Sequence, residues 1–150
     1  MAALIIISLI LVTSGILWFV RRTKRMYRSR SFRMDDQSSW QEKWHDLEAM
    51  MGDKPAHWPT AIIEADKLLD SVLKSMHLPG QDMGERFRFL MRDEPKLRYA
   101  RTARFIRNRV VHESSFELDE SLAKEAMSIY KKILKDLGIP LIYRRLSITL

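Results

Sequence analysis

The chain opens with an apolar run, residues 2–20, that contains no charged side chain. At 1.5 Å per residue in a helix this run is about 28 Å long, close to the thickness of the hydrocarbon part of a bilayer. Basic residues follow the run and none precedes it, which argues against a cleaved signal peptide. Only Ser8, Thr13 and Ser14 are polar, too few for the polar face of a core helix. The pattern predicts a transmembrane anchor over residues 2–20.

Beyond residue 38 the pattern changes, and apolar residues recur every three or four positions, which is the period of an amphipathic helix. The stripes predict helices at about residues 38–52, 58–77, 85–92, 95–112 and 119–137. Ser39 and Glu42 have the spacing of a capping box, and Gly138 suits a C-terminal cap. Strand-like alternation is weak and confined to the tail, residues 139–150. We therefore expect an all-α fold, an N-terminal transmembrane helix followed by a bundle of four to five helices over residues 38–138.

The net charge of +7 comes from one short segment behind the apolar run. Of the 26 Lys and Arg residues seven lie in residues 21–33, and the other 19 are balanced by 19 Asp and Glu. Basic residues beside a membrane helix stay on the cytoplasmic side, so we expect the N-terminus outside and residues 21–150 in the cytoplasm. Residues 21–37 would be a basic linker at the membrane surface, with about 1 kcal/mol of attraction per basic residue to anionic lipid. The predicted membrane-surface residues are Arg21, Arg22, Lys24, Arg25, Arg28, Arg30 and Arg33.

Composition excludes several kinds of site. The chain has no cysteine, which rules out disulfides, zinc–thiolate centres and cysteine nucleophiles. Its four histidines show no metal-ligand spacing with each other or with the carboxylates. We therefore expect neither a metal site nor a cofactor.

One arginine falls on the apolar side of the predicted helix over residues 95–112. At 100° per residue, Arg107 lies within an apolar arc made by Tyr99, Ala100, Ala103, Ile106, Val110 and Val111. Burying an unpaired guanidinium costs several kcal/mol, so Arg107 must meet a carboxylate, a partner chain or a ligand. The candidate partners on the neighbouring helix are Asp66, Asp70 and Glu64.

Arg107, Asn108 and His112 form an Arg-Asn-x3-His motif at the end of this helix, and a last amphipathic helix follows it. In this arrangement the chain resembles the HEPN superfamily of α-helical bundle domains, over about residues 57–138. The whole chain is also similar to small bacterial single-pass membrane proteins with this type of domain. The resemblance implies an HEPN-like bundle behind an anchor in the bacterial inner (plasma) membrane.

The same resemblance implies metal-independent cleavage of RNA, in which a ribose 2′-hydroxyl attacks the adjacent phosphate. His112 would then be the acid/base group, Arg107 would hold the phosphate, and Asn108 would orient either of them. It also implies a homodimer, and a defence or toxin–antitoxin setting with an antitoxin or other protein partner. A structural interpretation stays open, because Arg107 and His112 point about 140° apart on an ideal helix. In that interpretation Arg107 pairs inside the bundle and His112 caps the helix C-terminus.

The region around the motif is basic, with nine Lys and Arg residues between residues 86 and 109 against two acidic residues. Such a face suits the phosphate backbone of RNA. The candidate nucleic-acid-binding residues are Arg98, Arg101, Arg104 and Arg109. The leading expectation is a membrane-anchored RNA-binding domain. Metal-independent endoribonuclease activity would be an additional property of this domain. The alternative is a non-catalytic, membrane-tethered module for protein interaction or dimerisation.

Overall fold

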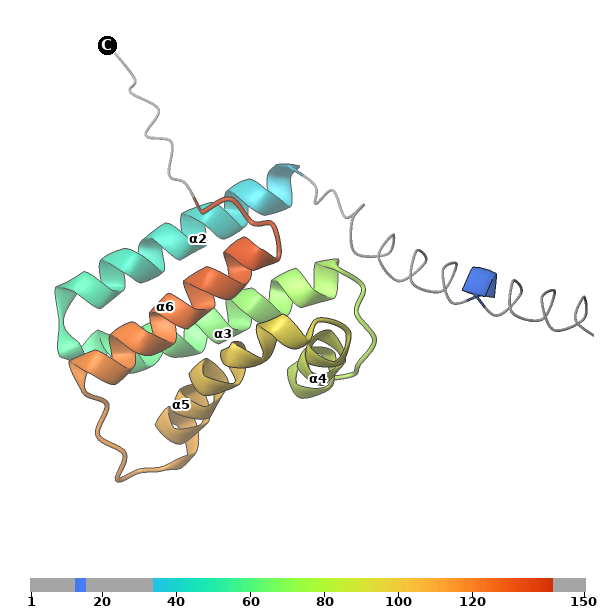
Figure 1. Cartoon of the computed structure of the whole chain (residues 1–150). Coiled ribbons are helices and arrows are strands. Elements are labelled where there is room, and N and C mark those ends of the chain that lie inside the picture. Colours follow the sequence, from blue (N-terminus) through green and yellow to red (C-terminus); the bar gives the residue numbers. More distant parts are fainter. Residues whose placement is uncertain (1–12, 16–33, 142–150) are drawn as a thin grey trace, which may run out of the picture. The chain divides into compact units, whose positions relative to one another are not determined.

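The computed structural model describes residues 13–15 and 34–141, and the fold is built from the second range (Figure 1). This range forms five α-helices and two 3-10 helices. The α-helices are α2 (Met34–Asp53), α3 (Trp58–Ser75), α4 (Met83–Asp93), α5 (Ala100–His112) and α6 (Glu120–Asp136), and the 3-10 helices are η1 (Pro55–His57) and η2 (Pro95–Tyr99). No strand occurs among the described residues, so the prediction of an all-α fold is confirmed.

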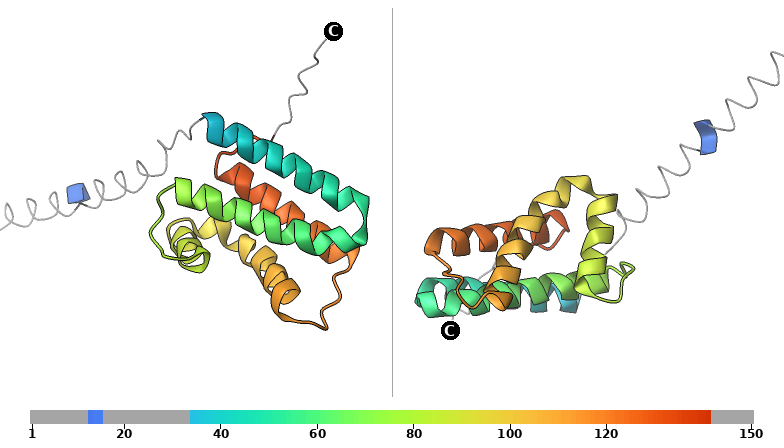
Figure 2. Two further views of the ribbon diagram at one scale, coloured as in Figure 1. Left: turned by 180° about the vertical axis from the view of Figure 1, so that it is seen from behind. Right: turned by 90° about the horizontal axis from the view of Figure 1, so that it is seen from below.

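The central helix is α3, which contacts α2, α4, α5 and α6. Helices α2 and α3 lie side by side and α6 packs over α3 as part of a second layer (Figure 2). Every residue of the apolar stripe predicted for α3 is buried, namely Ile62, Ala65, Leu68, Leu69, Val72, Leu73 and Met76. This stripe is therefore the middle of the hydrophobic core.

The flanking helices contribute narrower faces to the same core. Trp40 and Trp44 of α2 are buried, so these two rings pack in the core. Helix α5 buries small residues, Ala100 and Ala103, which let its backbone approach its neighbours. Val111 is 42% exposed, so the predicted apolar arc is wrong at the last turn, because α5 ends beyond the edge of the core.

Two predicted helix ends and the continuity of one predicted helix can be compared with the structure. Helix α2 begins at Met34, so Ser39 is inside the helix and the predicted capping box is wrong. No glycine or proline lies between Met34 and Ser39 to interrupt the helix before the predicted cap. The predicted helix over residues 95–112 is divided into η2 and α5. The cap at Gly138 is confirmed by its φ of +93° and by the Ile139 N–H, which donates to the Leu134 carbonyl at 3.0 Å.

The predicted transmembrane helix requires a correction to the fold class. Within residues 13–15 and 34–141, no helix combines the length and the apolar character needed to cross a bilayer. Helix α2 has 20 residues, but acidic and basic side chains recur along it. The predicted anchor at residues 2–20 lies almost wholly outside the described residues, as do the seven basic residues of 21–33 and most of the tail at 139–150. Over the described residues the fold is thus an all-α bundle, and no membrane-spanning helix is among its elements.

The loop between α3 and α4 contains a glycine that the fold requires. Gly80 has a φ of +142°, and a Cβ at this position would lie 2.7 Å from the Arg86 backbone nitrogen. We expect Gly80→Ala to destabilise the full-length chain by about 1–3 kcal/mol, because it adds both backbone strain and a clash with backbone.

Gly52→Ala is the matched control for this change. Gly52 lies in α2 with open space around the position of a Cβ, so alanine should stabilise the helix by up to about 1 kcal/mol. Thermal unfolding followed by circular dichroism measures both variants. A Gly80→Ala chain as stable as the wild type would contradict the loop geometry.

Candidate functional site

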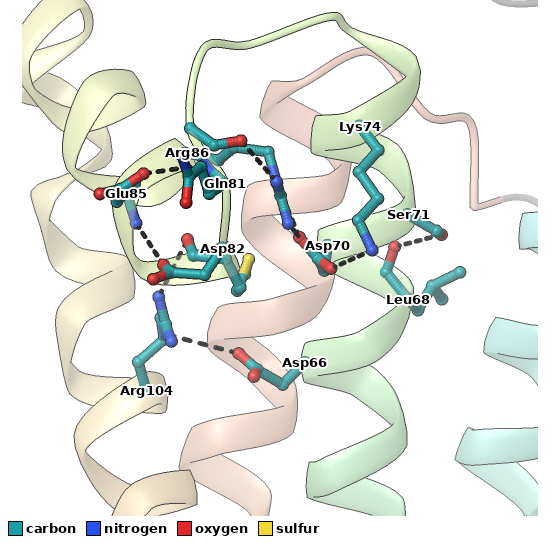
Figure 3. A network of polar contacts seen from close by, with 12 residues as sticks. Asp66, Leu68, Asp70, Ser71, Lys74, Gln81, Asp82, Glu85, Arg86 and Arg104 are labelled. Carbon is teal, nitrogen blue, oxygen red and sulfur yellow. Dashed lines mark hydrogen bonds and ion pairs between the residues drawn. The ribbon is translucent and has the colours of Figure 1, made fainter.

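A buried carboxylate lies where α3, α5 and α6 meet. Asp66 of α3 has only 5% of its side chain exposed. The Tyr130 hydroxyl of α6 donates to Asp66 Oδ1 at 3.0 Å. Two arginines of α5 approach the same carboxylate, with Arg104 Nε 3.5 Å from Oδ1 and Arg107 Nε 3.3 Å from Oδ2 (Figure 3 shows the Arg104 contact). Asp66 thus joins three helices through polar contacts.

The spacing on α5 explains how one carboxylate attracts two arginines. Residues three apart share a helix face, so Arg104 and Arg107 both point toward α3. The buried Nε–H groups of Arg104 and Arg107 form no hydrogen bond with a described residue, so their attraction to Asp66 is mainly between charges. The two cations together compensate for taking one carboxylate out of water.

Burial also changes the proton affinity of the Asp66 carboxylate. Burial raises the pKa of Asp66, while the charges of Arg104 and Arg107 and the hydrogen bond from Tyr130 act in the opposite direction. Burial and the neighbouring Asp66 raise the pKa of Tyr130 well above its ordinary value. Tyr130 therefore keeps its proton and remains a hydrogen-bond donor to Asp66.

A second ion pair lies one turn further along α3 (Figure 3). The Arg86 guanidinium of α4 donates to Asp70 Oδ1 from Nε at 3.0 Å and from Nη2 at 2.7 Å, and to the Gly80 carbonyl from Nη1 at 2.9 Å. Lys74 Nζ lies 2.8 Å from Asp70 Oδ2. Burial acts to raise the pKa of Asp70, but the hydrogen bonds and charges of Lys74 and Arg86 outweigh it and lower the pKa. This network fastens the loop between α3 and α4.

The three candidate partners of Arg107 can now be distinguished. Asp66 is the carboxylate within ion-pair distance of Arg107, whereas Asp70 pairs with Arg86 and Glu64 pairs with Lys67 at 2.6 Å. Arg86 is a residue whose role was not predicted from the sequence. The sequence pattern could have indicated this role. Arg86 lies on the apolar side of α4 between Met83 and Leu90, and an arginine in such a position needs a buried partner.

The motif residues are divided between the inside and the outside of α5. Asn108 and His112 are exposed, while Arg107 has 24% of its side chain exposed. Arg107 Nη1 donates to Asn108 Oδ1 at 3.2 Å, so this arginine extends from the buried carboxylate to the surface. His112 forms no hydrogen bond or ion pair with a described residue. The structure joins Arg107 to Asn108 by this hydrogen bond, and among the described residues neither of them forms a hydrogen bond with His112.

The candidate nucleic-acid-binding arginines are divided in the same way. Arg98 and Arg101 are exposed, and Arg101 Nε contacts the Met91 sulfur at 3.3 Å. Arg104 is directed inward, and besides Asp66 it donates to the Met83 carbonyl at 3.3 Å. Arg109 pairs with Glu113 at 2.8 Å and remains partly exposed.

Five residues of α5 share the side of the helix that faces away from Asp66. At 100° per residue they fall within an arc of about 100°. We call this surface the α5 outer face, and it consists of Arg101, Phe105, Asn108, Arg109 and His112. Four of the five carry hydrogen-bond donors, and two are permanently cationic.

Two surface hollows lie away from this face. One, of about 370 Å³, is lined by residues of α2 and α3 that include Lys43 and Lys67. The other, of about 320 Å³, lies between α2 and α6 beside Trp44 and Met127. Neither hollow contains a residue of α5. Among the described residues, no group of three His, Asp or Glu side chains could hold a metal ion.

Comparisons of this chain with protein-family models, curated proteins and solved structures found no match. The resemblance to the HEPN superfamily therefore stays a prediction from the motif and its position.

We expect Asp66→Ala to lower the free energy of unfolding of the full-length chain by about 3 kcal/mol, because it leaves two largely buried arginines without a counter-charge. Glu64→Ala, two residues away on the same helix, removes only the exposed pair with Lys67 and should cost less than about 1 kcal/mol. Chemical denaturation measures both variants. Equal decreases would contradict a central role for Asp66.

The lowered pKa of Asp70 predicts a stability that depends on pH. A carboxylate with a lowered folded-state pKa stabilises the fold above its ordinary value of 3.8 and loses this contribution as the pH falls. The stability difference between the wild type and Asp70→Asn should therefore be greatest near neutral pH and shrink below about pH 4. Thermal unfolding of both chains across this range measures the difference. A difference that does not vary with pH would show that the charge of Asp70 contributes little.

Proposed function

We propose that residues 34–141 carry an RNA-binding domain and that the α5 outer face contacts the RNA. One observation carries the proposal. Within the described part of the chain, Arg101 of the α5 outer face is exposed and has no carboxylate partner, and the same holds for Arg98, one turn before it in η2. The inward-directed Arg104 and Arg107, in contrast, both pair with Asp66. Cations that are exposed and not neutralised by the protein are available to phosphate.

The rest of the face adds donors of the kind that RNA requires. Asn108 accepts a hydrogen bond from Arg107 through its oxygen, which leaves its amide N–H groups for a ligand. His112 is exposed one turn further along. Arg109 shares its charge with Glu113, but it lies at the surface and can also reach a phosphate. Binding through such a surface requires no metal ion.

We propose binding of the RNA and do not propose its cleavage. Attack by a 2′-hydroxyl needs a proton acceptor and a stabilising cation at the same phosphate. Arg107 is engaged by Asp66 and Asn108, and among the described residues it forms no hydrogen bond with His112. The exposed cations support binding, whereas no arginine–histidine pair among the described residues supports cleavage.

The test neutralises two cations of the α5 outer face by Arg101→Gln and Arg109→Gln. We expect weaker binding of a short single-stranded RNA, because fewer phosphates are neutralised. The logarithmic slope of binding against salt concentration should fall by about 0.7 for each phosphate that the variant no longer binds. Fluorescence anisotropy of labelled RNA at several salt concentrations measures both quantities.

The matched control removes two cations elsewhere, by Lys43→Gln and Lys67→Gln at the hollow between α2 and α3. Both pairs of substitutions are made in the full-length chain, so the basic residues at 21–33 contribute equally to every measurement. If the control substitutions weaken RNA binding as much as the α5 substitutions do, the RNA binds elsewhere and the proposal is refuted.

A further inference from the structure

The α5 outer face contains an aromatic ring that the core does not use. Phe105 is 63% exposed, while the next residue, Ile106, is 3% exposed. A single exposed apolar residue is ordinary on a protein surface. What surrounds the ring is therefore more informative than its exposure.

The neighbours of Phe105 on the helix are polar or charged. Arg101 lies one turn before it, and Asn108 and Arg109 lie one turn after it. The Arg109 guanidinium is 5.8 Å from the centre of the Phe105 ring and 4.1 Å from the centre of the Phe116 ring. The exposed ring is thus surrounded by cations and amide donors, and one cation is held near it by cation–π contact.

We infer that Phe105 is a platform on which an unpaired base stacks, so that the ligand of this face is single-stranded RNA. The inference rests on the proposed RNA binding and names the form of RNA. In a duplex, the faces of the bases are covered by their neighbours, and only an unpaired base can offer its face to an aromatic side chain. Arg101 and Arg109 then meet the phosphates on either side of the stacked nucleotide.

A protein partner fits the same surface less well. An interface core is depleted of charged residues and needs a contiguous apolar area. Val111, the other large exposed hydrophobic residue among those described, lies about 120° around the helix from Phe105. The two apolar side chains therefore do not form one patch, and the neighbours of the Phe105 ring are polar or charged.

The experiment compares Phe105→Ala, Phe105→Leu and Phe105→Trp in the full-length chain. The probes are a labelled single-stranded RNA of mixed sequence and the same sequence as a duplex. Stacking on an aromatic ring predicts that alanine and leucine weaken single-strand binding by roughly fivefold to a hundredfold and that tryptophan retains it. The salt dependence should stay unchanged, because no charge is removed.

Val111→Ala is the control, since it removes the other exposed hydrophobic residue of α5 and should leave binding unchanged. Circular dichroism verifies that each variant is folded. The supporting result is a wild-type preference for the single strand that disappears with alanine and leucine and remains with tryptophan.

Two other results overturn the inference and are distinguishable. If the Arg101 and Arg109 substitutions weaken binding while Phe105→Ala does not, RNA binding stands and the stacking platform is refuted. If leucine binds as well as phenylalanine, the residue makes an apolar contact of the kind found in protein interfaces, and base stacking is also refuted. If the wild-type chain binds no RNA, both the proposed function and this inference are refuted.

Discussion

The carboxylate of Asp66 is taken out of water at the junction of α3, α5 and α6, and side chains of α5 and α6 compensate its charge. A buried carboxylate needs a hydrogen-bond donor and a counter-charge. Tyr130 supplies the donor from α6, and Arg104 and Arg107 supply the charge from α5. Because these contacts come from separate helices, they constrain how α5 and α6 are placed around α3.

The geometric consequence is a fixed rotation of α5. Once Arg104 and Arg107 are directed toward Asp66, the residues on the opposite arc must face outward. Phe105 and His112 are exposed for this reason, although the sequence alone would allow other rotations. Arg107 also extends from Asp66 to Asn108, so the buried charge is connected to the α5 outer face through one side chain.

Asp70, one turn further along α3, also pairs with an arginine of a neighbouring helix. Its arginine comes from α4, and the Arg86 guanidinium also binds the Gly80 carbonyl in the preceding loop. The opposite pKa shifts of the two carboxylates reflect their surroundings. Asp66 is almost fully buried and the effect of burial prevails, whereas Asp70 is more exposed and two hydrogen-bonded cations prevail.

The sequence by itself determined the helical class, the buried stripe of α3 and the need of Arg107 for a partner. These follow from local periodicity and from the cost of burying an unpaired charge. It left open which carboxylate Arg107 meets, and it missed Arg86 and the break between η2 and α5. Only the tertiary structure decided these points, because a salt bridge between helices depends on how the helices rotate and pack. The same packing directed Arg104 inward to Asp66, although the sequence had placed Arg104 among the candidate nucleic-acid-binding residues.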